Sequence, residues 1–298
     1  YMDNQLKLEY AHRLQATRSE AAKRGLEALL VFGLAPRRVG DLMYLCGHQP
    51  LLPGHPRRFG FRGRGYSAIV LPIVGDPVLV TSTPFYEKDL PIQDIRYDDD
   101  LPSAITDALR EMGLVRGDIG IVGTDILGLS LYWDLIKDLP MARFTPTDDI
   151  IMNLRAAKSP YEISLLRKGA QIGDEVAALL REFLHPGLTE RQVYQFITEE
   201  LTKRGVSGAF ATCQSGCRSE TAYDLVPASD KVIEDGDMVH MEINGKYGGY
   251  MIDICRSTVV GTPSKEQIRI LDVTLEMLER SIEAMRPGVI AEDLEQIS

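Results

Sequence analysis

A unit made of a helix, Pro-Gly, an aliphatic residue and a second helix occurs twice in this sequence, and it constrains the fold more than any other feature. The two copies are LHPGLTERQVYQFI, around Pro186, and MRPGVIAEDLEQIS, around Pro287. Their recurrence predicts an internal duplication, although Pro-Gly is also a common helix stop and can recur by chance. The chain continues into a pair of strands after the first copy but not after the second. A duplicated fold would therefore lack roughly 100 residues at its C-terminal end.

The segments that precede the first copy predict a separate domain. Helix-like and strand-like patterns alternate there, which is typical of an α/β domain with a mixed sheet. We expect helices over residues 3–25, 102–112 and 129–139, and strands over 26–32, 67–73, 77–82 and 118–123. Gly75-Asp76 predicts a two-residue turn between two of these strands.

A helix-start signal marks the entry to a second domain. Ser159 is a capping residue, Pro160 suits the first turn, and Glu162 lies three residues after the cap. We therefore divide the chain into a domain over residues 1–152 and a domain over 153–298. In the second domain we expect helices over 159–184, 189–203 and 263–285, a strand pair over 238–244 and 250–260, and a fourth helix from residue 291. Thr189 and Ser264, each with a Gln three residues later, are the predicted caps of the second and third helices. The strand pair turns around Lys246-Tyr247-Gly248-Gly249.

Charge and composition exclude several classes of protein. The 298 residues carry a net charge of −10, which disfavours nucleic acid and anionic membranes as partners. The sequence contains no run of about 18 apolar residues that would span a membrane, and its polar start, YMDNQLKLEYAHRL, lacks a signal-peptide core. Four cysteines are too few for a disulfide framework in a chain of this length. We therefore expect a cytoplasmic protein with free thiols, and zinc held by Cys213 and Cys217 is the alternative.

The strand pair at 238–260 carries the side chains best suited to chemistry. Because alternate residues of a strand share a face, His240, Glu242 and Asn244 lie together. Asp253 and Cys255 share a face of the second strand for the same reason. Two carboxylates on adjacent strands repel one another unless a cation lies between them, and a divalent metal with oxygen ligands is one solution. The alternative is a half-exposed hairpin whose charged face is simply solvated.

A second cluster of charge lies in the first domain. Six arginines fall between residues 37 and 64, against a single acid there, Asp41. The six are Arg37, Arg38, Arg57, Arg58, Arg62 and Arg64. Guanidinium groups bind carboxylates through paired hydrogen bonds, so this stretch predicts recognition of an acidic group. A basic surface loop is the alternative, and contact of FRGRG with nucleic acid is a poorer one given the net charge.

These segments together resemble the family of creatinase, prolidase, aminopeptidase P and methionine aminopeptidase. The similar stretches follow the family order over nearly the whole chain: LEALLVFG, LMYLCGH, AAKSPYEISLLRKGAQIGDE, HPGLTERQV, EDGDMVHMEINGKYGGYMIDICRSTVVGTPSKEQ and RPGVIAEDL. The resemblance implies an α/β creatinase-like N-terminal domain. It also implies an α+β catalytic domain with the pita-bread fold, incomplete at its C-terminal end.

The resemblance implies a site for divalent ions (Mn²⁺, Co²⁺ or Zn²⁺). Glu242 stands where the family has its first metal-binding Asp, and Asp253 matches the second. The remaining His and both Glu of the family's ligand set normally lie beyond residue 298. A further catalytic His of the family falls here on Leu225, and we expect His240 to supply an imidazole to the site instead.

Two more expectations follow from the creatinase branch of this family. Arg64, in GRGY, matches an arginine that binds the substrate carboxylate in the active site of the partner subunit, which implies a homodimer. Cys255 stands where creatinase has a Glu, and we expect a packed thiol there because no base for a nucleophile is evident.

Three functions are compatible with these residues. The leading hypothesis is a metal-assisted hydrolase of a C–N bond in a small peptide or amide, similar to Xaa-Pro dipeptidase and aminopeptidase P. The second is a creatinase-like hydrolase that uses no metal. The third is a non-catalytic relative that binds a partner through the same cleft. Leu225, in place of a catalytic His, favours this hypothesis, whereas the presence of Asp253 beside a second carboxylate disfavours it.

Overall fold

The chain divides into two compact units, Tyr1–Tyr161 and Glu162–Ser298. The computed structural model describes residues 4–35, 38–50, 54–58, 60–82, 90–221 and 226–297. The boundary expected after residue 152 falls inside a helix of the first unit, α5 (Asp148–Ala156). The long helix that follows, α6 (Pro160–Phe183), carries the chain into the second unit.

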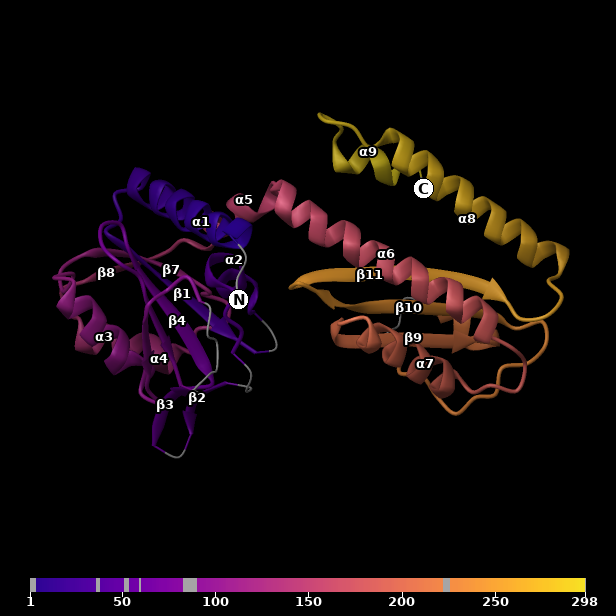
Figure 1. The fold of residues 1–298 in the computed structure, drawn as a ribbon, viewed down its shortest axis with the longest axis horizontal. Coiled ribbons are helices and arrows are strands. Elements are labelled where there is room, and N and C mark those ends of the chain that lie inside the picture. The colour runs from indigo at the N-terminus through magenta and orange to yellow at the C-terminus, as the bar shows by residue number, and fades with distance from the viewer. Residues whose placement is uncertain are drawn as a thin grey trace. The chain divides into compact units, whose positions relative to one another are not determined.

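The first unit is built on a mixed six-stranded sheet with the strand order β6-β5-β4-β1-β7-β8. Its strands are β1 (Ala28–Leu34), β4 (Tyr66–Pro72), β5 (Val78–Thr81), β6 (Asp94–Tyr97), β7 (Asp118–Val122) and β8 (Arg143–Pro146). β1 pairs antiparallel with β4 and parallel with β7, so the predicted α/β class with a mixed sheet is confirmed. A separate hairpin, β2 (His55–Arg58) and β3 (Phe61–Arg64), projects beside this sheet (Figure 1).

Helices cover both faces of this sheet and form two cores (Figure 1). One face packs against α3 (Leu101–Glu111) and α4 (Leu129–Asp138), and the other packs against α1 (Asn4–Lys23), α2 (Gly40–Cys46) and α5. The helices predicted at 3–25, 102–112 and 129–139 are therefore confirmed. The predicted two-residue turn at Gly75 is wrong: β4 ends at Pro72 and β5 begins at Val78, so a five-residue loop joins them. β2, β3, β6 and β8 were not expected from the sequence.

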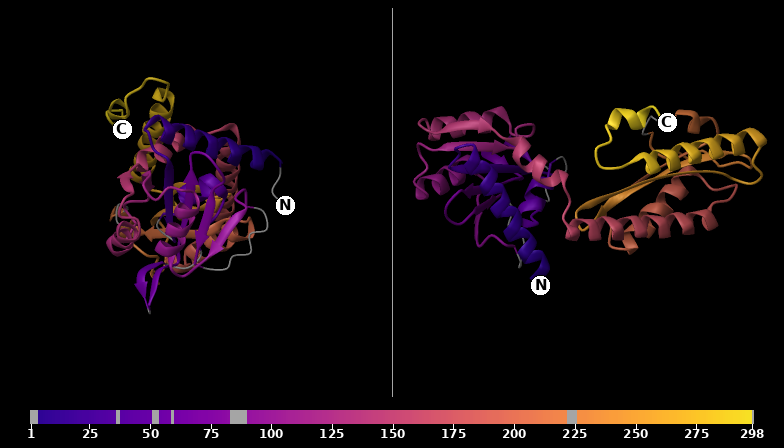
Figure 2. Two further views of the ribbon diagram at one scale, coloured as in Figure 1. Left: turned by 90° about the vertical axis from the view of Figure 1, so that its left-hand side faces the viewer. Right: turned by 90° about the horizontal axis from the view of Figure 1, so that it is seen from above.

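The second unit places two helices on one face of a three-stranded antiparallel sheet (Figure 2). The sheet order is β11 (Tyr250–Val259), β10 (Met238–Tyr247) and β9 (Ser207–Ser215). α6 and α7 (Glu190–Lys203) pack against one face of this sheet. They cover its apolar side chains, which include Val239, Met241 and Ile243 of β10. The opposite face is therefore left for the polar residues of the same strands. Helix α8 (Lys265–Ala284) follows β11 and lies near the edge of the sheet that β11 forms (Figure 1).

Both copies of the repeated unit have the same local structure, a Pro-Gly pair followed by a helix. Gly187 and Gly288 adopt left-handed φ values of 94° and 91°, and each precedes a helix, α7 and α9 (Ala291–Glu295) respectively. Complete capping boxes begin α7 and α8, as the sequence predicts. Within the described ranges, no helix combines the length and apolar character needed to cross a bilayer.

Candidate functional site

The pairing of β10 with β11 brings the predicted site residues onto one face. Three pairs lie directly opposite one another: His240 with Ser257, Glu242 with Cys255, and Asn244 with Asp253. Gly248 and Gly249 join the strands with φ values of 55° and 87°, a pair of positive values that suits a tight two-residue turn. The turn fixes the register, and a slip of β11 by one residue would move Asp253 to the buried face, away from Glu242.

Glu242 and Asp253 are diagonal neighbours across this strand pair. Diagonal positions lie within about 7–8 Å of one another, close enough for long side chains to meet. Asn244 Nδ2 donates to Oε2 of Glu242 at 3.4 Å. Among the described residues, no Lys or Arg forms an ion pair with either carboxylate. Within the described ranges, the repulsion between these two like charges is therefore not offset by an ion pair with Lys or Arg.

The side chains on this face have the chemistry of ligands for a divalent ion, but they are not yet arranged around one. Carboxylate and imidazole ligands are provided by Glu242, Asp253 and His240, whose chemistry suits Mn²⁺, Co²⁺ or Zn²⁺. No group of three or more His, Cys, Asp or Glu is already gathered as a metal cluster among the residues that the structure describes. The face therefore offers ligands but would need side-chain movement to bring three of them to one ion.

His240 lies between a hydroxyl and a thiol. Its Nδ1 is 3.1 Å from Ser257 Oγ, and its Nε2 is 3.4 Å from Cys255 Sγ. Burial raises the pKa of the Cys255 thiol, the charge of Glu242 raises it further, and Arg256 opposes them. The expectation that Cys255 is a packed thiol is wrong, because its position on the polar face leaves the residue exposed.

Two more of the predicted thiols, Cys213 and Cys217, lie in β9 and just after it. Cys213 and Cys217 are both free, the first buried and the second exposed, so they form no C-x3-C pair in this structure. Burial and the charge of Glu190 raise the pKa of Cys213 to about 12, and Lys231 opposes them. A thiol of this kind is inert at neutral pH.

β9 extends the polar face and was not expected from the sequence. Thr212 lies opposite Glu242 on the other side of β10, and Gln214 lies opposite His240. Both are buried. The alternation of small and polar residues in AFATCQS is the signal that could have identified this strand. Leu225, the position expected to replace a catalytic His, lies outside the described residues.

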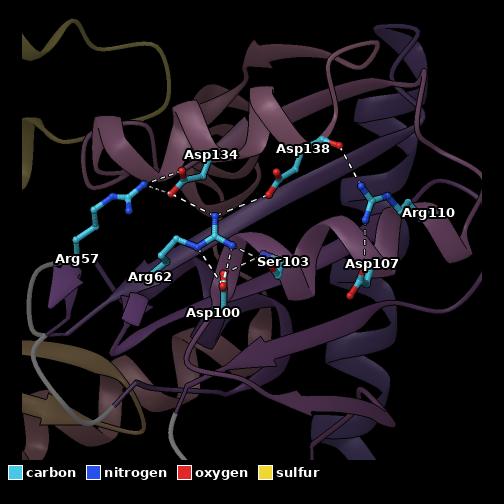
Figure 3. A network of polar contacts seen from close by, with 8 residues as sticks. All are labelled: Arg57, Arg62, Asp100, Ser103, Asp107, Arg110, Asp134 and Asp138. Carbon is cyan, nitrogen blue, oxygen red and sulfur yellow. Dashed lines mark hydrogen bonds and ion pairs between the residues drawn. The ribbon is translucent and has the colours of Figure 1, made fainter. Parts of the chain in front are cut away.

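The arginine cluster of the first unit is largely used to hold the β2–β3 hairpin (Figure 3). Arg62 donates to Asp100 Oδ2 and to Ser103 Oγ, each at 2.7 Å. Arg57 donates to both carboxylate oxygens of Asp134, also at 2.7 Å. These contacts tie the hairpin to α3 and α4, so Arg57 and Arg62 have structural partners rather than a free carboxylate-binding role.

Arg64 differs from its neighbours in the cluster. Its side chain is 50% exposed, its Nε is 3.8 Å from Asp99 Oδ1, and its guanidinium lies 4.9 Å from the ring centroid of Phe61. Arg38, by contrast, donates to both Asp41 and Asp148. Arg37 and the side chain of Arg58 lie outside the described residues. Arg57 is about as exposed as Arg64, at 54%, but it is bonded to Asp134, whereas the contact of Arg64 with Asp99 is long.

A buried carboxylate that the sequence did not single out holds the edge of the β9 strand. Glu190 is fully buried, and its Oε1 accepts from the backbone and hydroxyl of Ser215 at 2.9 and 3.0 Å. Its Oε2 accepts from the backbone and hydroxyl of Ser229 at 3.1 and 2.6 Å. Burial alone would raise the pKa of Glu190, but these hydrogen bonds outweigh it and the net pKa is lowered. Glu190 thereby links α7, the end of β9 and the segment that leads to β10.

The second unit of the chain is similar to a known family of metallopeptidases. The sequence pattern of Metallopeptidase family M24 matches residues 164–298. The Xaa-Pro dipeptidase of Pyrococcus furiosus is 34% identical over 182 residues, which cover 60% of this chain and 51% of that protein. The Xaa-Pro dipeptidase of Pyrococcus horikoshii is 29% identical over 232 residues, covering 76% of this chain and 66% of that protein. The chain thus spans about half the length of the first relative and about two thirds of the length of the second.

A solved structure supports the fold over nearly the whole chain. The X-Pro aminopeptidase of Thermotoga maritima superposes with a TM-score of 0.81 at 22% identity, and the match covers 96% of this chain and 75% of that one. At this identity the likeness establishes the fold alone. The predicted combination of a creatinase-like α/β domain with a pita-bread domain is confirmed.

Proposed function

Because the pattern of Metallopeptidase family M24 matches residues 164–298, we propose that the whole protein is a metal-assisted hydrolase of a peptide or amide C–N bond. The observation that carries the proposal is the pair Glu242 and Asp253, two neighbouring carboxylates without an ion-paired Lys or Arg among the described residues. The printed names of the relatives, Xaa-Pro dipeptidase and X-Pro aminopeptidase, support an Xaa-Pro dipeptide as the first substrate to test.

In this proposal Glu242 and Asp253 hold a divalent ion, Mn²⁺, Co²⁺ or Zn²⁺. When bound, such an ion supplies Lewis-acid polarisation of the scissile carbonyl. Asn244 orients Glu242 through the hydrogen bond to Oε2. His240 offers an imidazole two residues away on the same strand face, where it can accept or return a proton.

We extend the proposal to a homodimer in which Arg64 binds the carboxylate of the substrate. Its exposure and its long contact with Asp99 support this role, since Arg64 can exchange that partner for a ligand. Loss of a charge-assisted hydrogen bond costs about 1.5–3 kcal/mol, so Arg64→Ala should raise KM by about 10- to 100-fold. Arg57→Ala is the control, because its guanidinium is committed to Asp134.

Metal analysis of the purified full-length protein tests the central claim. We expect stoichiometric divalent metal, hydrolysis of Xaa-Pro dipeptides that chelator abolishes, and loss of metal in Glu242→Ala and Asp253→Ala. Glu283→Ala removes an exposed carboxylate from α8 and should leave metal content unchanged. Turnover that persists in metal-free protein would instead favour a creatinase-like reaction. A folded protein that binds metal but hydrolyses no peptide or amide would favour a non-catalytic binding role.

A further inference from the structure

A cavity of about 310 Å³ lies between α6 and the strands β10 and β11. Its floor is apolar, with Leu180 and Leu184 from the helix and Met241 from β10, and its polar lining includes Arg181 and Arg256. Because Arg256 lies directly opposite Met241, a residue of the apolar core, the cavity belongs to the face of the sheet away from the proposed metal site. The proposed hydrolase therefore does not account for it.

The sizes of the residues along α6 explain why this space is open. Gly173 lets the helix approach β11 closely, since a Cβ added there would lie 2.2 Å from Cδ1 of Ile254. One turn further along the helix, the cavity is lined by Ala177 and Ala178, whose side chains are single methyl groups. The helix is thus held close to the strand at the glycine, and the small residues that follow it leave room for a ligand.

The residues of β11 that face the helix change where the cavity opens. Ile252 is buried, and Ile254 packs against the same apolar core. The next two residues on that face are Arg256 and Thr258, and both line the cavity. The covered face of an antiparallel sheet normally continues with apolar residues. A guanidinium and a hydroxyl in these positions therefore indicate a place for a polar group.

The charges around the cavity favour an anion. Arg256 donates to Asp174 Oδ1 at 3.1 Å, but both side chains are accessible, at 49% and 67% exposure. Arg181 forms no ion pair with an acid of the described ranges. Among the described residues that line the cavity, Asp174 is the single acid against two arginines. One positive charge is therefore left without a partner, and guanidinium groups bind carboxylates through paired hydrogen bonds.

We propose that this cavity binds a small monocarboxylate with a short aliphatic chain. The carboxylate lies between Arg181 and Arg256, and the chain lies against Leu180 and Leu184 on the apolar floor. The volume is at the lower end of the range of ligand pockets, about 300–1,000 Å³, which suits a short chain rather than a long one. The site is separate from the proposed metal centre and does not depend on it.

Titration of the full-length, metal-free protein with hexanoate tests the site, followed by NMR of methionine methyl groups labelled with ¹³C. Met241 lies in the cavity and reports its occupancy, whereas Met152, an exposed methionine of the first unit, is the internal reference. We expect the Met241 signal to shift saturably and the Met152 signal to stay in place. Hexanol keeps the chain but lacks the charge, and inorganic phosphate keeps the charge but lacks the chain. Each should bind at least tenfold more weakly than hexanoate.

Two substitutions on α6 test the charge and the space separately. Arg181→Gln should weaken hexanoate about tenfold, because it removes a charged donor. Arg167→Gln is its control, since this arginine is exposed on the same helix but does not line the cavity. Ala178→Leu should abolish binding by filling the cavity. Ala170→Leu makes the same change at an exposed position of the helix away from the cavity and should keep the affinity.

Asp174→Asn gives a change in the opposite direction. It removes the acid that competes for Arg256, so hexanoate should bind about two- to fivefold more tightly. A Met241 signal that does not respond to hexanoate would overturn the inference, and so would wild-type affinity in Arg181→Gln or Ala178→Leu. Equal affinity for hexanol or for phosphate would overturn the assignment to an aliphatic carboxylate. Circular dichroism confirms that each variant is folded before titration.

Discussion

Replacement of Glu190 by Gln should destabilise the second unit strongly. Glu190 is fully buried, and each of its oxygens accepts two hydrogen bonds, from Ser215 and from Ser229. Glutamine keeps one acceptor oxygen but replaces the other with an NH₂ group. That group would face two donors, one a backbone N–H that cannot reverse its role. The substitution also removes the negative partner of Arg218, whose Nε lies 3.3 Å from Oε1.

The expected loss follows from these contacts. Hydrogen bonds to a charged group contribute about 1.5–3 kcal/mol each, and two of the four lose their acceptor. Breaking a buried charge interaction costs about 3–5 kcal/mol in comparable cases. The side chain of Arg218 is 34% exposed, so we assign no further energy to that ion pair. We therefore expect the free energy of unfolding to fall by about 3–5 kcal/mol, a large share of the usual 5–15 kcal/mol.

Hydrogen-exchange mass spectrometry across a urea series measures this loss in each unit separately. With a slope of about 2 kcal/mol/M, the midpoint for peptides of the second unit should fall by about 2 M, and that of the first unit should not move. Glu199→Gln is the matched control, since this residue lies on the same helix but is 66% exposed. It should change stability by less than about 0.5 kcal/mol. An equal effect of the two substitutions, or an equal shift in both units, would refute the reasoning.

Three further predictions concern pH and the first unit. Because the pKa of Glu190 is lowered in the folded protein, its carboxylate stabilises the fold at pH values above the unfolded pKa of about 4.3, and this contribution is lost as pH falls through the lower folded pKa. The difference in unfolding free energy between wild type and Glu190→Gln, measured in urea, should therefore shrink in acid. A difference that stays constant with pH would contradict this prediction. Arg62→Ala should lower the stability of the first unit by about 1–2 kcal/mol, because it removes several bonds to α3, whereas half-exposed Arg64→Ala should cost less than about 0.5 kcal/mol; equal midpoints in urea would count against this. Gly120→Ala should cost about 1–3 kcal/mol, since an added Cβ would lie 2.5 Å from the buried Leu29 side chain, and an unchanged melting temperature would exclude that crowding.

Local patterns in the sequence predicted most of the elements that carry the site. Capping residues marked the starts of α7 and α8, and Gly248-Gly249 marked the turn between β10 and β11. Each of these signals acts over a few residues, through side-chain bonds to nearby backbone or through the φ values that glycine allows. They are therefore readable without knowledge of the tertiary structure.

Other elements were missed because their formation depends on distant partners. β9 pairs with β10 across more than twenty residues of chain, and its own segment lacks a long apolar run. β6 and β8 are edge strands with charged residues, so their short sequences resemble loops. The five-residue loop at Gly75 likewise replaced the expected tight turn, because the strand pairing ends at Val70 and Val78.

The sequence by itself determined which side chains share a strand face, since alternation with a period of two put Glu242 with His240 and Asp253 with Cys255. Only the tertiary structure decided which groups these residues meet. It assigned Arg62 to a structural network and left Arg64 accessible, and it buried Glu190 among donors from two separate segments. The physical reason is that hydrogen bonds and ion pairs depend on distances of a few ångströms between residues far apart in the chain. Local periodicity fixes the direction of a side chain but not its partner.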